Sequence, residues 1–407
     1  MLTRSISPVK ILVAHNAYHY RGGEDSVVDA EVSLLRRHGH EVLLYRRDNA
    51  DILQMPRWRT ALDTFWSGRT VDEINKLQCG FRPDLIHAHN TFPLISPSLY
   101  SIAKKLRIPV IQTLHNFRLI CPQAMLMRNG RSCTECVGHW PWRGVMHRCY
   151  RNSLPQSAVT AAMLSTHRVT GTWKHRVTRY IVLNQTCREL FANGGLPADR
   201  MRVKPNFVEP RGTPDWEDRN GAVFIGRLSP EKGLETLARA MQRLPGARVA
   251  VYGKGPLQSM VEHCVGLEYG GFESGEVLRQ RLAKAAFLVM PSTGIESFGL
   301  AAIEAFASGT PVIASRQGGL REIVEHRRNG LLVAPGDAED LAWAINFANA
   351  HPQEIRRMGM EAYQSYLAHY TPERNYATLM HIYDEALASL PSSYPSNLIH
   401  ADTRAGG

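Results

Sequence analysis

Short apolar runs alternate with helix-like segments along most of this chain, and the alternation starts again in its second half. In the first half, the runs that we predict to be strands are residues 9–14, 41–45, 84–89, 110–115 and 180–184. Apolar residues at helical spacing follow the first run, from Val27 to Leu35. Strands that alternate with helices favour a parallel sheet covered by helices on both faces.

The second series begins after a polar stretch from Glu209 to Asn220. Its predicted strands are residues 222–225, 248–252, 287–290, 311–314 and 330–333. With 407 residues, the chain is also longer than one hydrophobic core usually spans. We therefore predict an α/β protein with two doubly wound, Rossmann-like domains that face each other across a cleft.

The restart of the pattern sets the expected domain limits. We predict an N-terminal domain over residues 1–204, with a Cys-containing insertion at 121–150, and a C-terminal domain over 205–370. Thr371-Pro372-Glu373 is typical of a helix start, and the helix over 371–390 is expected to cross back to the N-terminal domain. The tail at 391–407 is expected to be disordered.

Positive charge is concentrated in the first half of the chain. Residues 1–204 contain 29 Lys and Arg against 14 Asp and Glu, a balance of +15, whereas the rest has 19 against 23, or −4. No acid lies between Gln156 and Arg188, and five cations accumulate around Trp173: Arg168, Lys174, Arg176, Arg179 and Arg188. Such a surface suits anionic lipid headgroups, an anionic acceptor or a nucleic acid backbone, and a solvated basic face without a partner is the alternative.

No apolar run in the sequence predicts export or a membrane span. The N-terminal residues lack a long apolar stretch of the signal type, and no window of about 18 uncharged apolar residues occurs. We therefore expect a cytoplasmic protein whose basic half can place it on the inner face of the plasma membrane.

Two carboxylates stand eight positions apart between Gly294 and Phe306. Glu296 is expected in the loop after strand 287–290, and Glu304 about two turns into the next helix. Carboxylates are good partners for vicinal sugar hydroxyls, and the amides at the start of that helix, from Phe298 to Leu300, suit an anion. The pattern indicates a sugar-nucleotide site. The alternative is a solvated loop acid followed by an ordinary helix-surface acid.

Three Gly-containing loops follow predicted strands of the second domain. The loop from Gly226 to Gly233 brings Arg227 and Lys232 beside a helix N-terminus, which outlines a diphosphate site. Tyr252-Gly253-Lys254-Gly255-Pro256 and Ser315 to Glu322 are the other two loops. The carboxyl ends of parallel strands are where such a sheet binds a nucleotide. Unrelated surface cations on ordinary loops are the alternative.

The first domain contributes residues of the same kind. Gly22 and Gly23 would let a backbone approach the same phosphates from across the cleft. His115 ends a predicted strand at the same crevice, where it could contact a transferred sugar. A buried, hydrogen-bonded structural histidine is an equally good interpretation of His115.

Together these residues resemble the retaining glycosyltransferases of the GT-B fold, specifically the large group 1 family, family 4. The resemblance covers nearly the whole chain. It rests on Arg21-Gly22-Gly23-Glu24, Leu114-His115-Asn116, Pro205-Asn206-Phe207-Val208, Gly226 to Gly233, Gly253-Lys254-Gly255-Pro256, the Glu296-x7-Glu304 spacing and Ser315 to Glu322.

The resemblance implies a role for each matched residue. Arg227 and Lys232 would hold the diphosphate, Glu304 the ribose hydroxyls, and Glu296 with the amides of Phe298, Gly299 and Leu300 the donor sugar. His115 would lie near the sugar and Gly22 and Gly23 near the diphosphate, with Gly253 also on the donor side. The segment from Tyr269 to Gly271 matches the place where the family's backbone flanks the base, and no side chain there specifies uracil over guanine, so a UDP- or GDP-sugar is expected.

The residues present also suggest a mechanism. No Asp-x-Asp motif occurs, so there is no obvious carboxylate cage for a catalytic metal, and catalysis is expected to need no cofactor. Glu296, His115, Arg227 and Lys232 are the expected catalytic residues. We predict front-face attack by the acceptor hydroxyl with retention of anomeric configuration, in the synthesis of a cell-envelope glycan or glycolipid from a glycan or lipid-linked acceptor.

Four of the seven cysteines cluster in the expected insertion: Cys121, Cys133, Cys136 and Cys149. In a cytosolic chain a C-x2-C pair with two further cysteines favours structural zinc over disulfides. His139 or His147 could replace one thiolate.

Two other functions fit parts of the sequence. A sugar-nucleotide epimerase of the same fold would turn over the donor without an acceptor. A nucleic-acid-binding module would use the basic half and the cysteine cluster, although it would need neither the paired Gly loops nor the paired carboxylates.

Overall fold

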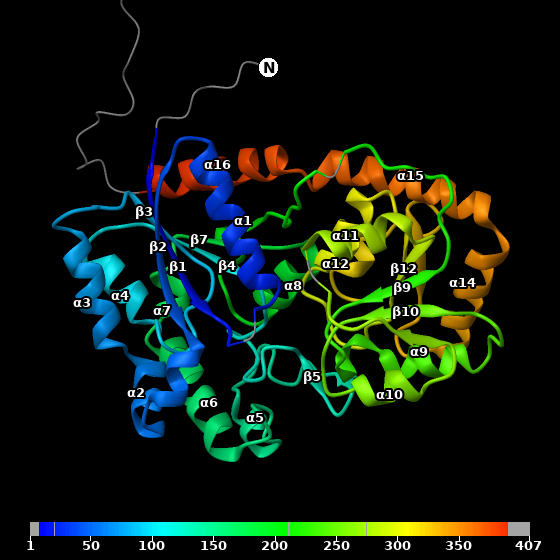
Figure 1. The fold of residues 1–407 in the computed structure, drawn as a ribbon. Coiled ribbons are helices and arrows are strands. Elements are labelled where there is room, and N and C mark those ends of the chain that lie inside the picture. The colour runs from blue at the N-terminus through cyan, green and yellow to red at the C-terminus, as the bar shows by residue number, and fades with distance from the viewer. Residues whose placement is uncertain (1–7, 20, 211, 274, 390–407) are drawn as a thin grey trace, which may run out of the picture.

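The computed structural model describes residues 8–19, 21–210, 212–273 and 275–389. It confirms the predicted fold class, with two α/β domains side by side (Figure 1). The tail expected over 391–407 lies outside the described residues.

The first domain is built on a six-stranded parallel sheet of order β2-β1-β3-β4-β7-β8. Its strands are β1 (Lys10–Ala17), β2 (Glu41–Asp48), β3 (Leu85–Ala88), β4 (Val110–Leu114), β7 (Arg179–Val182) and β8 (Met201–Val203). Its helices are α1 (Gly23–Arg37), α2 (Arg57–Phe65), α3 (Gly68–Leu77), α4 (Ser98–Lys105), α5 (Trp142–Met146), α6 (Leu154–Val169), α7 (Thr172–His175) and α8 (Gln185–Asn193), with short 3-10 turns η1 (Asn49–Gln54) and η2 (Ala198–Arg200). A small antiparallel hairpin of β5 (Met127–Arg128) and β6 (Arg131–Ser132) lies in the expected insertion.

The second domain has a second six-stranded parallel sheet, of order β11-β10-β9-β12-β13-β14. Its strands are β9 (Ala222–Ile225), β10 (Val249–Tyr252), β11 (Leu267–Tyr269), β12 (Phe287–Met290), β13 (Val312–Ser315) and β14 (Gly330–Val333). Its helices are α9 (Leu234–Met241), α10 (Gln258–His263), α11 (Gly275–Lys284), α12 (Leu300–Ala307), α13 (Leu320–Ile323), α14 (Ala338–Ala350) and α15 (Pro352–His369), with the 3-10 turn η3 (Pro230–Lys232). Both strand orders reverse beside the first strand of their sheet, which places a topological switch point at its carboxyl end.

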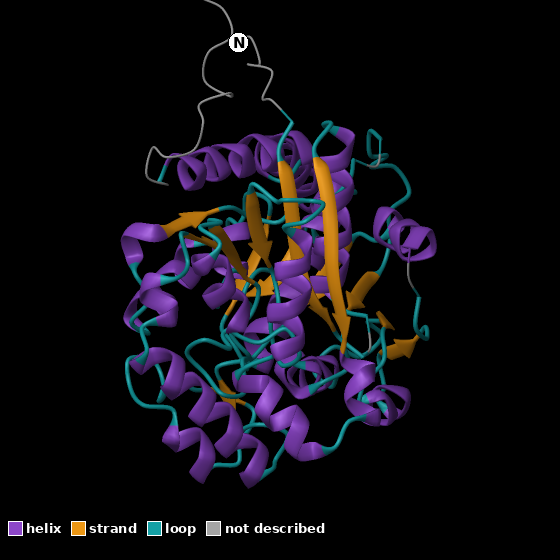
Figure 2. Cartoon of the chain, turned by 90° about the vertical axis from the view of Figure 1, so that its left-hand side faces the viewer, coloured by secondary structure: helices purple, strands orange, loops and turns teal. Residues whose placement is uncertain are grey.

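The last helix, α16 (Pro372–Ala388), returns to the first domain. α15 packs against α12 in the second domain, whereas α16 packs against α1 and β4. Figure 1 shows the two helices nearly end to end along one side of both domains, and Figure 2 shows α16 passing the starts of the long strands. Thr371 caps α16 by accepting a hydrogen bond from the amide of Arg374, with Pro372 in the first turn.

Loops from both domains meet between the two sheets. Asn184, which caps α8, donates its side-chain amide to the carbonyl of Ser297 at 2.6 Å. The amides of Gln185 and Thr186 donate to the carboxylate of Glu322 at 2.9 and 2.6 Å. These contacts hold the carboxyl ends of the two sheets against each other, where the predicted site residues lie.

Candidate functional site

The loop from Gly226 to Gly233 connects β9 to α9 through η3. Gly233 precedes α9 with φ 72°, and a Cβ there would lie 1.8 Å from the carbonyl oxygen of Pro291. Only glycine fits this close approach and this conformation together. The loop is therefore pressed against the end of β12, next to the loop that carries Glu296.

Lys232 and Glu296 form an ion pair at this junction. The Lys232 Nζ lies 2.6 Å from Glu296 Oε1, and the Ser292 hydroxyl donates to the same oxygen at 2.7 Å. Burial opposes ionisation of Glu296, but Lys232, Ser292 and Arg227 outweigh burial and lower the pKa of this carboxyl. Glu296 is therefore a carboxylate at neutral pH, and Lys232 keeps two further N–H donors for a ligand.

Arg227 lies at the outer side of the same loop. Its guanidinium contacts the carboxylate of Glu231 at 3.0 Å, and its side chain is 61% exposed. Ser229 also donates to Glu231, at 2.6 Å. The structure thus brings Arg227, Lys232 and Glu296 together around one loop, with Arg227 largely in solvent.

The helix after Glu296 begins later than we predicted. α12 starts at Leu300, after Gly299 at φ 116°, so Glu304 lies little more than one turn into it instead of about two. Leu300 is only partly buried and packs against the edge of the second domain's core. Because Glu304 follows Leu300 by four residues, both side chains lie on the one face of α12 that the core leaves accessible.

This accessible face meets the first domain at Gly23. A Cβ on Gly23 would lie 2.9 Å from the Leu300 Cδ1 atom, so the N-terminus of α1 touches the N-terminus of α12. Two helix N-termini from different domains therefore point to one region, and each carries unpaired amides and partial positive charge. Gly22 is the N-cap of α1.

Gly253, Tyr269 and Gly271 come together at the ends of β10 and β11. The Gly253 amide donates to the Gly271 carbonyl at 2.8 Å, and the Tyr269 hydroxyl donates to the Gly253 carbonyl at 3.2 Å. A Cβ on Gly253 would lie 1.9 Å from the carbonyl oxygen of Gly226. These residues thus lie directly beside the loop that carries Lys232. Phe298 is buried in the core of the second domain, so its backbone and not its ring is available to a ligand.

His115 follows β4 and begins a chain of buried polar contacts. His89 Nδ1 lies 2.8 Å from His115 Nε2, and His89 Nε2 lies 3.3 Å from Glu31 Oε1. Burial first, and then the neighbouring His89, holds the pKa of His115 well below its usual value. Burial followed by His87 lowers the pKa of His89 to about 3. Both rings are therefore neutral at neutral pH.

The Glu31 carboxylate lies within ion-pair distance of His87, His89 and Lys204. Burial opposes its ionisation, but Lys204 and the neighbouring histidines hold the pKa of Glu31 well below its usual range. His89 Nε2 and Glu31 Oε1 lie within ion-pair distance, and neither atom has a hydrogen-bond partner among the described residues. The Nδ1 of His115 has no hydrogen bond to the part of the chain that the structure describes.

Glu31, His87 and His89 are also the one group of three ligand-type side chains in the described ranges whose ligand atoms lie within 4.8 Å of one another. Lys204 Nζ bonds the second Glu31 oxygen at 2.8 Å and is itself buried. The ammonium already balances the carboxylate charge, so these residues fit a polar network better than a metal site.

The sequence analysis assigned no role to a partly buried acid of the first domain, Glu24. Glu24, directly after Gly23, accepts from the Tyr18 hydroxyl at 2.9 Å and from the Asn116 amide at 3.3 Å. Burial raises its pKa, and its Oε1 has no hydrogen-bond partner among the described residues. Its position in the Gly-Gly-Glu motif, at the start of a helix opposite His115, was the available signal.

The four clustered cysteines are free thiols. Burial, and then the charge of Cys121, raises the pKa of Cys136 to about 11, and Cys133 and Cys149 act on it in the same direction. The four thiols are thus neighbours, but among the described residues they do not form a group with ligand atoms within 4.8 Å. Structural zinc bound by these thiols therefore stays a prediction, and no step of the chemistry below depends on it.

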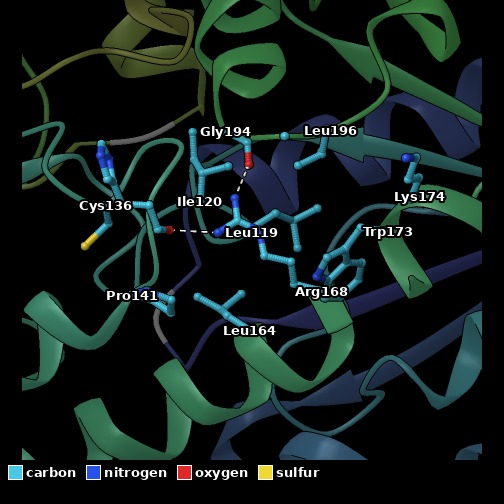
Figure 3. A pocket seen from close by; sticks show the side chains of 12 residues that line it. Leu119, Ile120, Cys136, Pro141, Leu164, Arg168, Trp173, Lys174, Gly194 and Leu196 are labelled. Carbon is cyan, nitrogen blue, oxygen red and sulfur yellow. Dashed lines mark hydrogen bonds between the residues drawn. The ribbon is translucent and has the colours of Figure 1, made fainter. Parts of the chain in front are cut away.

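The basic surface expected around Trp173 is formed only in part, because Lys174 is exposed but other cations contact the fold. Trp173 is buried, and Arg168 is used inside the domain, where it donates to the carbonyls of His139 at 2.7 Å and Gly194 at 2.6 Å. Figure 3 shows these two bonds across a pocket of about 130 Å³ that Trp173 also lines. Arg179 pairs with Glu385 of α16 at 3.0 Å. Several of the predicted surface cations therefore stabilise the fold.

Both domains are similar to glycosyltransferase domains of known proteins. A family model described as Glycosyltransferase Family 4 matches residues 21–211, and one described as Glycosyl transferases group 1 matches residues 219–348. The chain is 29% identical to the sulfoquinovosyl transferase SQD2 of Arabidopsis thaliana over 299 residues, 72% of this chain and 54% of that protein. The first three curated relatives are matched over 31% to 54% of their own length.

Solved structures share the arrangement of both domains. Sucrose-phosphate synthase from Thermosynechococcus elongatus superposes with a TM-score of 0.69 at 20% identity, covering 93% of this chain and 99% of that chain. Anabaena Alr3699/HepE, solved in complex with UDP-glucose, gives 0.67 at 18% identity over 92% and 100%. The chain thus has the GT-B fold, and its two domains are similar to a family 4 and a group 1 glycosyltransferase domain.

Proposed function

We propose that this protein is a retaining glycosyltransferase, which moves a sugar from a nucleotide-diphosphate donor to an acceptor hydroxyl. The observation that carries the proposal is the Lys232–Glu296 ion pair at 2.6 Å, at the junction of two Gly-containing loops and beside the N-terminus of α12. A cation with spare donors suits a diphosphate, and the adjacent carboxylate suits sugar hydroxyls. Neither the epimerase nor the nucleic-acid alternative is favoured by the matched domains.

Each group of the donor would contact a different set of residues in these loops. Lys232 and Arg227 would contact the diphosphate, Glu304 the ribose, and Glu296 with the amides of Gly299 and Leu300 the sugar. The close approach of Gly23 to Leu300 supports a contribution from the first domain. Because a structural neighbour is known with UDP-glucose, we favour a UDP-sugar over a GDP-sugar as the donor.

The proposed reaction is a front-face displacement. The acceptor oxygen bonds to the anomeric carbon on the side from which the diphosphate leaves, and the carbon–oxygen bond to the phosphate breaks. The departing phosphate oxygen takes the proton of the acceptor hydroxyl. Lys232, Arg227 and helix-terminal amides would stabilise the charge that develops on the leaving group, so the proposal requires no catalytic metal. His115 would form a hydrogen bond with a sugar hydroxyl through Nδ1.

The proposed setting is the synthesis of a cell-envelope glycan or glycolipid at the inner face of the plasma membrane. No described helix is both long and apolar enough to cross a bilayer.

A donor panel with one variant tests the activity. UDP-sugars are expected to raise the melting temperature of the wild type, because a ligand stabilises in proportion to its affinity and concentration. Lys232→Ala should keep the fold by circular dichroism but lose about 100-fold or more in turnover, the usual effect of removing a charged group that stabilises the transition state. The anomeric configuration of the product, read by NMR, tests retention. Stabilisation by no nucleotide sugar, or near wild-type turnover by Lys232→Ala, would contradict the proposal.

A further inference from the structure

Large apolar side chains are exposed along one face of α2. Trp58, Leu62 and Trp66 are 67%, 60% and 51% exposed. Because they are spaced by four residues, the three side chains lie on the same face of the helix and its end. α2 fully buries only Thr64, and the exposed apolar side chains beside it form a patch that is typical of an interaction surface.

A second exposed apolar group surrounds α5. Trp140, Trp142 and Met146 are 50%, 52% and 63% exposed. α6 packs against both α2 and α5, and Figure 1 shows the three helices at the same end of the first domain, opposite α16. We call Trp58, Leu62, Trp66, Trp140, Trp142 and Met146 together the aromatic end of the domain.

Unpaired cations flank the aromatic end. Arg57 and Arg59 lie on α2, and Arg148 and Arg151 follow α5, and none of the four forms an ion pair with a described residue. No Asp or Glu occurs in the sequence between Glu135 and Glu189. Asp51 and Asp63 are the acids near α2, so the balance of charge at this end is positive.

The combination of these side chains matches an anionic bilayer. Tryptophans are favoured at the boundary between lipid headgroups and acyl chains, where the ring is buried and the indole N–H stays hydrated. Arginines at the rim attract anionic headgroups. We propose that the aromatic end seats the protein on the surface of an anionic phospholipid bilayer, with α2 and α5 inserted at headgroup level.

The β5–β6 hairpin connects the first domain near the aromatic end to the loops of the candidate site. The β5–β6 hairpin, which precedes α5, reaches the second domain, where the Ser132 hydroxyl donates to the Thr293 carbonyl at 3.2 Å and accepts from Gln317 at 2.7 Å. A lipid-linked acceptor could thus pass from the bilayer to the cleft along one continuous segment. This link to the acceptor rests on the proposed function, whereas the binding to lipid does not.

Vesicle sedimentation tests the proposal without any substrate. The full chain should sediment with vesicles of phosphatidylcholine mixed with phosphatidylglycerol, and less with phosphatidylcholine alone or at high salt. The double variant Trp58→Ser/Trp142→Ser should lose at least about tenfold in partitioning, because two large apolar surfaces no longer leave water. Trp343→Ser, which removes a 46% exposed tryptophan from α14 in the second domain, is the matched control and should bind as the wild type does.

The other possible results of these experiments lead to different conclusions. Unchanged sedimentation of the double variant, or equal binding to neutral vesicles, would overturn the proposal. Concentration-dependent dimers that disappear in the double variant, without vesicle binding, would assign the surface to a second copy of the chain. A UDP-sugar thermal shift in the double variant separates failure of this surface from failure of the proposed function, since α2 and α5 carry none of the donor-site residues.

Discussion

Neutral histidines in the core of the first domain make its stability depend on pH. Burial and the neighbouring His87 lower the pKa of His89 from 6.5 to about 3 in the folded protein. An unfolded chain restores the ordinary value, so unfolding takes up a proton between these two values. Stability from this group is complete above pH 6.5 and is lost as the pH falls toward 3. Glu31, whose folded pKa is also depressed, adds a loss of the same sign at lower pH.

We therefore expect the free energy of unfolding in urea to fall from about pH 7 to about pH 5, by up to about 1.4 kcal/mol per pH unit for each such histidine. His89→Gln retains one donor and one acceptor but cannot titrate, so its slope should be shallower. His369→Gln, at an exposed histidine, is the control and should keep the wild-type slope. Equal slopes for wild type and His89→Gln would contradict the assignment of His89 as a neutral ring.

At the scale of elements, the loop between β9 and α9 depends on a glycine. Gly233 has φ 72°, and its added Cβ would meet Pro291 O at 1.8 Å, whereas Gly221 has φ 69° with no atom within 4 Å. Gly221→Ala should cost about 1–2 kcal/mol for the left-handed conformation alone. Gly233→Ala adds a clash with rigid backbone, so the loop must move and carry Lys232 with it.

The expected result is a larger loss of stability for Gly233→Ala than for Gly221→Ala, and a loss of UDP-sugar binding in Gly233→Ala alone. Chemical denaturation and thermal shift with the donor measure the two effects. If both variants bind the donor as the wild type does, the loop does not position Lys232 for the diphosphate.

The strands predicted at their observed residues are short, continuous apolar runs. Strands 222–225, 287–290 and 330–333 occur at the predicted residues, because each is an apolar run bounded by residues that break strands. The edge strands β8 and β11 were missed, since each has three residues and at least one exposed side chain, which leaves no continuous apolar signal.

Some residues of the candidate site could be predicted from the sequence in the same way, and others could not. The cations and glycines of the Lys232 loop could be predicted because the chemistry is local in sequence. The contact of Gly23 with Leu300 and the hydrogen bond from Asn184 to Ser297 join residues far apart in the chain, and no local pattern encodes them. Whether His115 was structural or functional stayed open for the same reason, since His89 and Glu31 lie on other elements.

At the scale of the whole molecule, the last helix belongs to the core of the first domain. Leu379, Met380, Ile382 and Tyr383 of α16 are buried beside residues of β1 and α1. The Tyr383 hydroxyl lies 2.7 Å from His87 Nδ1, and the Asn375 side chain accepts from Lys204 at 3.1 Å. The first domain is therefore completed only by residues that follow the second domain in the chain.

This arrangement predicts a domain-specific effect of one substitution. Leu379 is fully buried, so Leu379→Ala should cost about 2–5 kcal/mol. Leu367→Ala makes the same chemical change at a 41% exposed leucine of the neighbouring helix α15 and should cost much less. Hydrogen exchange read by mass spectrometry should show that Leu379→Ala lowers protection in β1, β3 and β4 while β9, β12 and β13 keep theirs. Equal loss of protection in both sheets would mean that the two domains unfold as one unit, and α16 would then stabilise the interface between the domains more than the first core.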